Sequence, residues 1–278
     1  MRNNTRRNRN IGTVKQGHGQ NNRLTIPDPY FLNGNHRFFT ERLTHYKRFS
    51  RTVNGYEFIF AVETPRADCR HACTVDDVAF MLAQIPASDY GDLRLIVFRQ
   101  PKRKEEILSP VWGRLGYAYR FEGKDVPAIL LEAMNPNEVL KWPKSMSVDR
   151  QNEFELLQQD GHVFMAGKRG YEAKLNLENV RATQLYRTLS HEFGHYVHYR
   201  QTVEIPASAL SVLSGMSENE RWNYYEESIN IAEKEKFAHA YADRLRADLL
   251  ARGVIPFPRK ESAAGDDPTE VFSSPPCV

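Results

Sequence analysis

The chain has 278 residues, 41% of them hydrophobic, and a formal net charge of +3. This composition suits a globular domain with a sizeable core, and no stretch approaches the roughly 18 consecutive apolar residues of a membrane span. The charge is too small to identify a nucleic-acid partner, and 3 cysteines are too few for a disulfide framework. No apolar stretch of the signal-peptide kind opens the chain, so we expect a cytoplasmic protein, or one exported by a route without a classical signal peptide.

The two ends differ in composition from the middle. Residues 1–27 are rich in Asn and Arg and contain no acidic residue, which predicts a disordered basic arm over 1–28. The arm lacks aromatic residues that stack on bases, so a solvated tail is favoured over nucleic-acid binding. We assign 29–54 to a lead-in segment, 55–252 to a folded domain and the proline-rich residues 253–278 to a flexible tail.

The folded domain begins with strand and helix signals in alternation. Residues 56–63 and 93–98 are rich in β-branched and aromatic residues, and the second run is apolar on both faces, as in an interior strand. Between these strands, Thr74 stands as an N-cap before a helix that has one apolar face and that Pro86 ends.

Two hairpins are predicted next. Residues 115–121 and 126–134 flank the turn Glu-Gly-Lys-Asp, and residues 162–166 and 171–177 flank Gly-Lys-Arg-Gly, with a short helix at 152–158 between the two hairpins. These elements predict an α+β fold with a small mixed sheet. An edge strand of such a sheet can pair with an extended peptide.

The most informative motif is the HExxH sequence His191-Glu192-Phe193-Gly194-His195. In a helix, side chains four residues apart project from one face, so the two imidazoles can bind a single metal ion. Residues 182–199 contain no proline and carry an apolar residue at every fourth position, which predicts a helix with one buried face. The apolar stripe consists of Leu185, Leu189, Phe193 and Val197.

A catalytic zinc site needs three protein ligands and an open position for water, so a third ligand must come from another segment. Residues 232–245 have a helical pattern with a packing face of small and aromatic residues, and Glu235 lies on the flank of that face. The sequence predicts a capping box at Ser217 and Glu220 and a helix end at Arg252-Gly253. Residues 217–252 fit either one long helix or two helices with a break near Ser228.

The HEFGH sequence followed by Glu235-x-Phe237-Ala238-x-Ala240-Tyr241 resembles the gluzincin metallopeptidases. It is most similar to the catalytic domain of anthrax lethal factor and its relatives, which include the proline-specific endopeptidases of clostridia. The resemblance implies a zincin-like lobe over 55–252, in which a small mixed β-sheet packs on the HExxH helix and on the glutamate-bearing helix. It also implies one Zn²⁺ ion held by His191, His195 and Glu235, with Glu192 as general base.

The chain departs from this family pattern at two positions. The family often has a second Glu where this chain has His239, so the groups that orient the ligand imidazoles must differ. The family pattern also has a Tyr seven residues before the glutamate ligand, and this chain has Ser228 at that position. Tyr224 and Tyr225 are the nearby candidates for a hydrogen bond to the oxyanion, and the register leaves the choice between them open.

Other residues near the motif fit the role of metal ligand less well. His198 is better explained as a neighbour of the ligands or as a surface residue. The other carboxylates that could serve as a third ligand are better explained as parts of an acidic helix surface. Cys69-x-His71-x-Cys73 lacks a second ligand pair, so ordinary thiols are favoured there. The carboxylates considered as alternative third ligands are Glu226, Glu227, Glu233 and Asp243.

The sequence therefore predicts a zinc-dependent endopeptidase that acts on a protein or peptide substrate. Zinc lowers the pKa of bound water toward about 7, and Glu192 can take the proton of that water and pass it to the leaving amine. One alternative is a regulatory protease that cuts repressors on mobile elements. Another is a noncatalytic zincin scaffold whose basic arm binds nucleic acid, although the carboxylate beside the first ligand argues against a purely structural metal site.

Overall fold

The computed structural model describes residues 30–32, 35–37, 43, 45–103, 106, 111–208, 212–216 and 218–261. Two short antiparallel strands, β1 (Tyr30–Leu32) and β2 (Asn35–Arg37), belong to one unit of the chain. All the elements described below belong to the second unit. In the described part of the chain, no helix combines the length and the apolar character needed to cross a membrane.

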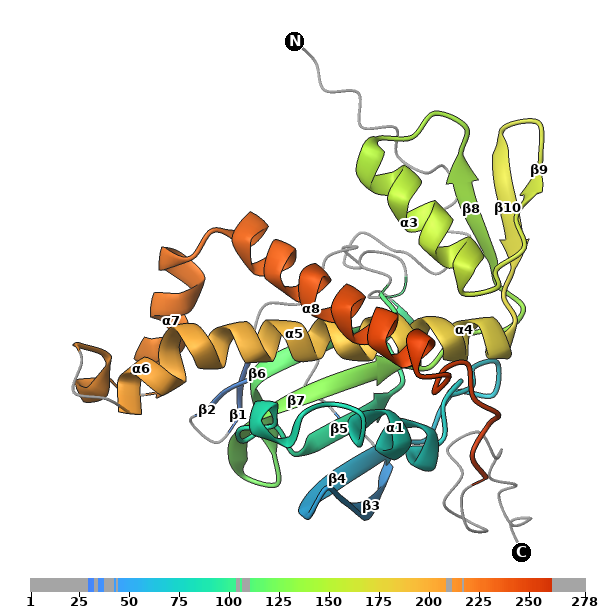
Figure 1. Ribbon diagram of the computed structural model, residues 1–278. Coiled ribbons are helices and arrows are strands. Elements are labelled where there is room, and N and C mark those ends of the chain that lie inside the picture. Colours follow the sequence, from blue (N-terminus) through green and yellow to red (C-terminus); the bar gives the residue numbers. More distant parts are fainter. Residues whose placement is uncertain are drawn as a thin grey trace, which may run out of the picture. The chain divides into compact units, whose positions relative to one another are not determined.

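A five-stranded mixed sheet forms the base of this second unit (Figure 1). Its order is β3-β4-β5-β7-β6, with β4, β5 and β7 parallel to one another and the two outer strands antiparallel to their neighbours. The strands are β3 (Tyr46–Val53), β4 (Tyr56–Glu63), β5 (Leu95–Arg99), β6 (Gly113–Phe121) and β7 (Lys124–Glu132). The predicted α+β class with a mixed sheet is thereby confirmed.

The predicted strands match this sheet closely, with one addition. The strand at Tyr56–Glu63 has the expected bounds, and the expected hairpin turns at Glu122 and Gly123, where both residues have positive φ. Residues 46–53, which we placed in the lead-in segment, form β3 and pair along their whole length with β4. Most of the side chains of β3 are exposed, so its sequence lacks the apolar signal by which a buried strand is recognised.

Alternate residues of the sheet point to opposite faces, and the face that holds Phe58, Phe60 and Phe98 forms the main core. Helix α1 (Val75–Leu82) packs into this core, and Thr74 caps it as predicted, since its side chain and that of Asp77 form a reciprocal capping box. A 3-10 turn, η3 (Ala87–Asp89), follows.

A smaller antiparallel sheet has the order β8-β10-β9, with α3 beside it in Figure 1. The predicted helix around 152–158 and the hairpin that follows are both confirmed, although the hairpin strands are shorter than expected. The elements are β8 (Val139–Pro143), α3 (Val148–Gln159), β9 (Met165–Ala166) and β10 (Gly170–Lys174).

One continuous helical run covers residues 177–208 and crosses the whole view in Figure 1. Two π-helical turns interrupt its α-helical hydrogen bonding, one before and one after the α-helical stretch Leu189–Tyr199 that contains the HExxH sequence. The run therefore extends well beyond the helix predicted for 182–199. Its parts are α4 (Leu177–Thr183), η4 (Gln184–Thr188), α5 (Leu189–Tyr199), η5 (Arg200–Glu204) and α6 (Ile205–Ser208).

After a 3-10 turn, η6 (Val212–Gly215), two helices complete the fold: α7 (Glu218–Ser228) and α8 (Ile231–Ala251). The break falls at Ser228, as one of the two sequence interpretations predicted, and the Asn230 side chain caps α8 by accepting a hydrogen bond from the Ala232 N–H. Helix α8 ends before Gly253, which has a φ of +64°. The predicted capping residue Ser217 lies outside the described residues.

Part of the predicted flexible tail packs against the domain. Ile255 and Phe257 are buried in the main core, and the Phe257 ring contacts Phe80 of α1 at 4.5 Å between centroids. The Lys260 N–H donates to an Asp77 carboxylate oxygen at 2.8 Å. Apolar residues placed between the prolines explain why this stretch packs despite its composition.

Candidate metal centre

Helix α5 presents the two histidines of the HExxH sequence on the side that faces away from the core. The predicted apolar stripe is confirmed, because Leu185, Leu189, Phe193 and Val197 are all buried in the main core. That packing fixes the rotation of the helix about its axis. His191 and His195 project together, one turn apart, and their Nε2 atoms lie 3.1 Å from each other.

Helix α8 packs across α5 and supplies the third side chain (Figure 1). The two helices approach closely at Gly194, where an added Cβ would lie 2.9 Å from the Cα and 3.0 Å from the carbonyl oxygen of Ala238. Any larger residue at 194 would meet backbone, which cannot move aside as a flexible side chain can. The small residues at this crossing therefore bring Glu235 up to the imidazole pair.

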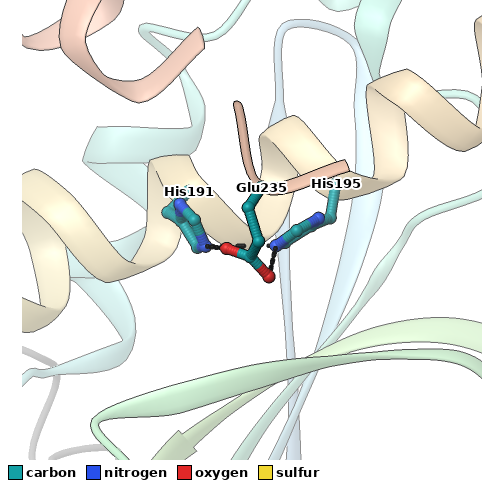
Figure 2. Close-up of side chains that lie close together, drawn as sticks. All are labelled: His191, His195 and Glu235. Carbon is teal, nitrogen blue, oxygen red and sulfur yellow. Dashed lines mark hydrogen bonds and ion pairs between the residues drawn. The ribbon is translucent and has the colours of Figure 1, made fainter. Parts of the chain in front are cut away.

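The three predicted ligands converge, as Figure 2 shows. The carboxylate of Glu235 lies between the rings, with Oε2 3.4 Å from His191 Nε2 and Oε1 3.5 Å from His195 Nε2. One ligand atom from each residue lies within 4.8 Å of the other two, and this is the only such group of His, Cys, Asp or Glu among the described residues. The arrangement forms a candidate metal site.

The protonation states suit a cation. Burial, together with repulsion from the neighbouring imidazoles, lowers the pKa of His191 to about 3 and that of His195 to about 4, so both rings are neutral at pH 7. Neutral imidazole nitrogens and a carboxylate are ligand types that zinc binds. At most one hydrogen can lie between the two Nε2 atoms, so hydrogen bonds cannot satisfy all the lone pairs of the imidazoles and of the Glu235 carboxylate. A cation placed among these atoms can accept electron density from all of them. The residues fit a divalent metal ion.

Glu192 lies beside this group without belonging to it. One of its carboxylate oxygens accepts a hydrogen bond of 2.7 Å from the Leu115 N–H of strand β6, which fixes the direction of the side chain. Burial raises the pKa of Glu192 to about 8, although the Leu115 N–H opposes the rise. The carboxylate is thus held between the sheet edge and the imidazole pair.

A pocket of about 220 Å³ opens where β6, α5, α7 and α8 meet. Its walls combine carboxylates with two cationic side chains, and strand β6 contributes residues that sequence analysis did not single out. Contacts between a strand and helices distant in sequence leave no local signal. The lining residues are Arg114, Leu115, Tyr117, Glu192, His195, Glu226, Ile231, Lys234 and Glu235.

Neither of the two predicted oxyanion donors lines this pocket. Tyr225 is fully buried, and its hydroxyl lies 2.7 Å from His198 Nδ1 and is hydrogen-bonded to the Tyr117 hydroxyl. Tyr224 is partly exposed on α7. Tyr117 of β6 is the phenol that lines the pocket, and burial holds its pKa well above the usual value, so the hydroxyl stays protonated.

The alternative ligands have other positions. His198 is buried against Tyr225 and Phe237, and Glu226 pairs with the buried Lys234 at 3.1 Å. Of the Cys69-x-His71-x-Cys73 segment, the His71 ring is bonded to the Glu63 carbonyl at 2.7 Å, and both cysteines are buried.

Comparison of the chain with models of known protein families, with curated proteins and with solved structures found no match. The geometry of the site therefore carries the functional argument.

Proposed function

We propose that this protein is a zinc-dependent endopeptidase, with His191, His195 and Glu235 as metal ligands and Glu192 as general base. The observation that supports it most directly is the convergence of two neutral imidazoles and one carboxylate, with a second carboxylate in the same pocket. A purely structural metal site needs no base beside its ligands. A hydrolytic site does.

Zinc in such a site lowers the pKa of a bound water and polarises a carbonyl oxygen. The side chains around it have separate tasks. The positive charge of a bound metal ion would lower the pKa of Glu192 and favour its ionised form. That carboxylate, oriented by the Leu115 N–H, would take a proton from the attacking water and later give a proton to the leaving amine. Tyr117 lines the same pocket and donates its hydroxyl hydrogen to the Tyr225 hydroxyl in the absence of substrate. Rotation of that hydroxyl would turn its hydrogen from Tyr225 toward the oxygen on which negative charge develops.

The sheet edge beside the site suggests how a peptide binds. Strand β6 is the last strand of the five-stranded sheet in the described part of the chain. An extended peptide can add to such an edge through main-chain hydrogen bonds, which tolerate many side chains. The Leu115 N–H is already used by Glu192, so the catalytic carboxylate is anchored to the strand along which the peptide would lie. This geometry favours a peptide substrate over a small molecule.

Metal analysis and peptide hydrolysis, measured on the same preparations, test the proposal. Glu192→Gln should keep zinc and lose hydrolysis of a peptide library by a factor of about 10²–10⁴, because only the proton acceptor is removed. Glu235→Ala should lose most of its zinc as well as its activity. Asp243→Ala, which removes an exposed carboxylate of the same helix, should change neither property.

The outcomes separate the two parts of the proposal. An active Glu192→Gln variant contradicts the role given to that residue. A wild-type protein that binds zinc but hydrolyses no peptide contradicts the endopeptidase assignment and leaves the metal centre in place.

A further inference from the structure

His239 adjoins the three candidate ligands on the helix that carries Glu235. It follows Glu235 by one helical turn, so both side chains project from the same face of α8. The distance between His239 Nε2 and Glu235 Oε2 is 3.8 Å. The ring centroid of His239 lies 4.6 Å from that of His191, and the His195 centroid lies at the same 4.6 Å on α5. His191 is thus flanked by two imidazoles at equal distance.

The two packed helices therefore each present a pair of ligand-type side chains spaced by four residues. Helix α5 presents two imidazoles, and α8 presents a carboxylate and an imidazole. Facing pairs of this kind, projecting inward from neighbouring helices, build the metal sites of helical bundles. The chain thus offers four nitrogen or oxygen ligands where a catalytic zinc site requires three.

The fourth side chain differs from the others in exposure. The His239 side chain is 64% exposed, against 18% for His191 and 13% for His195. It is not a member of the group whose ligand atoms lie within 4.8 Å of one another. An exposed side chain can change rotamer without moving the backbone, whereas the two imidazoles of α5 are held by packing. His239 can therefore approach the centre and retreat from it.

We propose that His239 is an exchangeable fourth ligand, which binds the metal through Nε2 when no peptide is present and leaves when a peptide enters. The inference rests on the proposed metal site. Zinc takes four ligands, and a site closed by four protein side chains has no open position. In the resting protein His239 fills that position, and its departure opens it. The centre is then shielded until a peptide competes for it.

A count of metal-bound imidazoles tests this assignment directly. The full chain is produced with ¹⁵N-labelled histidine, loaded with zinc, and examined by NMR for imidazole nitrogens shifted by the metal. We expect three such imidazoles in the wild type and two in His239→Ala. His45→Ala, which removes an exposed histidine outside the site, should retain three. Adding an excess of a peptide that binds in the cleft of the Glu192→Gln protein should reduce its count from three to two.

Zinc affinity gives a second readout that does not depend on activity. In competition with a chromophoric chelator, His239→Ala should bind zinc about 10–100-fold more weakly than the wild type, and His45→Ala should bind it equally well. Two metal-bound imidazoles in the zinc-loaded wild type would overturn the inference and leave the three-ligand centre standing. Failure of the wild type to bind zinc at all would overturn the proposed function as well.

Discussion

Tyr117 has a position that none of the other tyrosines near the centre shares. It lines the pocket beside Glu192, while its ring packs on Trp222 at 4.3 Å between centroids. Replacing it with Phe keeps the ring and removes only the hydroxyl. The substitution therefore keeps the packing and removes the hydrogen bonds of the hydroxyl, including the one to Tyr225.

We expect Tyr117→Phe to lower kcat for peptide hydrolysis by a factor of about 10²–10³, the usual effect of losing one oxyanion donor. Zinc content should stay the same, since the residue is not among the metal ligands. Steady-state kinetics beside Tyr224→Phe and Tyr225→Phe provide the comparison. If Tyr224→Phe or Tyr225→Phe caused the larger fall in kcat, the donor would be one of the two residues that the sequence suggested.

Asp77 illustrates a buried charge that stabilises the fold away from the centre. Its carboxylate oxygens lie 2.8 Å from Arg181 Nε and 2.7 Å from a terminal nitrogen of the same guanidinium. Burial on its own raises the pKa of Asp77, but the hydrogen bonds from Arg181 and from two backbone N–H groups outweigh it, so the pKa is lowered below 3.8. The ionised form is thus favoured by folding.

The sign of the pH dependence follows from this shift. Because the pKa is lower in the folded state, Asp77 stabilises the protein above the unfolded value of 3.8, and the contribution is lost as the pH falls below it. At pH 7, Asp77→Ala should lower the free energy of unfolding by about 3–5 kcal/mol, since it leaves Arg181 buried and unpaired. Urea unfolding at pH 7 and pH 3 measures both effects.

The adjacent residue is a matched control. Asp76 pairs with Arg51 at 2.6 Å, but both side chains are about a quarter exposed. Asp76→Ala should therefore cost about 1 kcal/mol or less. Equal losses for the two variants would contradict the importance given to burial.

At the level of elements, the crossing of α5 and α8 determines whether the ligands meet. In an isolated helix, Gly→Ala would stabilise by about 1 kcal/mol. At Gly194 the added methyl group would press on the Ala238 backbone. We expect Gly194→Ala to lower the free energy of unfolding by about 1–3 kcal/mol and to reduce zinc content, because Glu235 moves away from the imidazoles as the helices separate.

Thermal unfolding and metal analysis check this prediction against Gly215→Ala. No atom lies within 4 Å of a Cβ placed at Gly215, so that variant should keep both its stability and its zinc. An unchanged Gly194→Ala protein would show that the crossing is looser than the distances indicate.

The elements also show what the sequence could and could not predict. The Thr74 N-cap and the HExxH helix follow from residues within one or two turns, and both were predicted. Strand β3 was missed because its side chains are mostly exposed and only pairing with β4 defines it. The contacts of Leu115 and Tyr117 with the centre depend on how β6 packs against α5, and no local pattern encodes that packing.

At the scale of the whole molecule, residues 254–260 join helices that are distant in sequence. The Phe257 ring contacts Phe80 of α1 and Tyr186 of η4, and the Lys260 carbonyl accepts a hydrogen bond from the Thr74 hydroxyl. The segment therefore connects the start of α1 with the helical run that leads into α5.

Removing residues 254–278 should lower the free energy of unfolding by about 3–6 kcal/mol relative to removing 262–278 alone. The difference reflects the loss of buried Ile255 and Phe257, each of which contributes about 1.5–3 kcal/mol. Denaturant titration of the two truncated proteins measures it. Similar midpoints would mean that this segment packs without stabilising the domain.

The division of the centre between α5 and α8 bears on how the protein is made. During translation the imidazole pair leaves the ribosome before the segment that carries Glu235, and that glutamate reaches the pair only after α7 has turned the chain back. A growing polypeptide therefore carries an incomplete ligand set. Under the proposed function, hydrolytic activity arises only after α5 and α8 have packed together. The unfinished chain therefore cannot cleave itself or other nascent chains on the same mRNA.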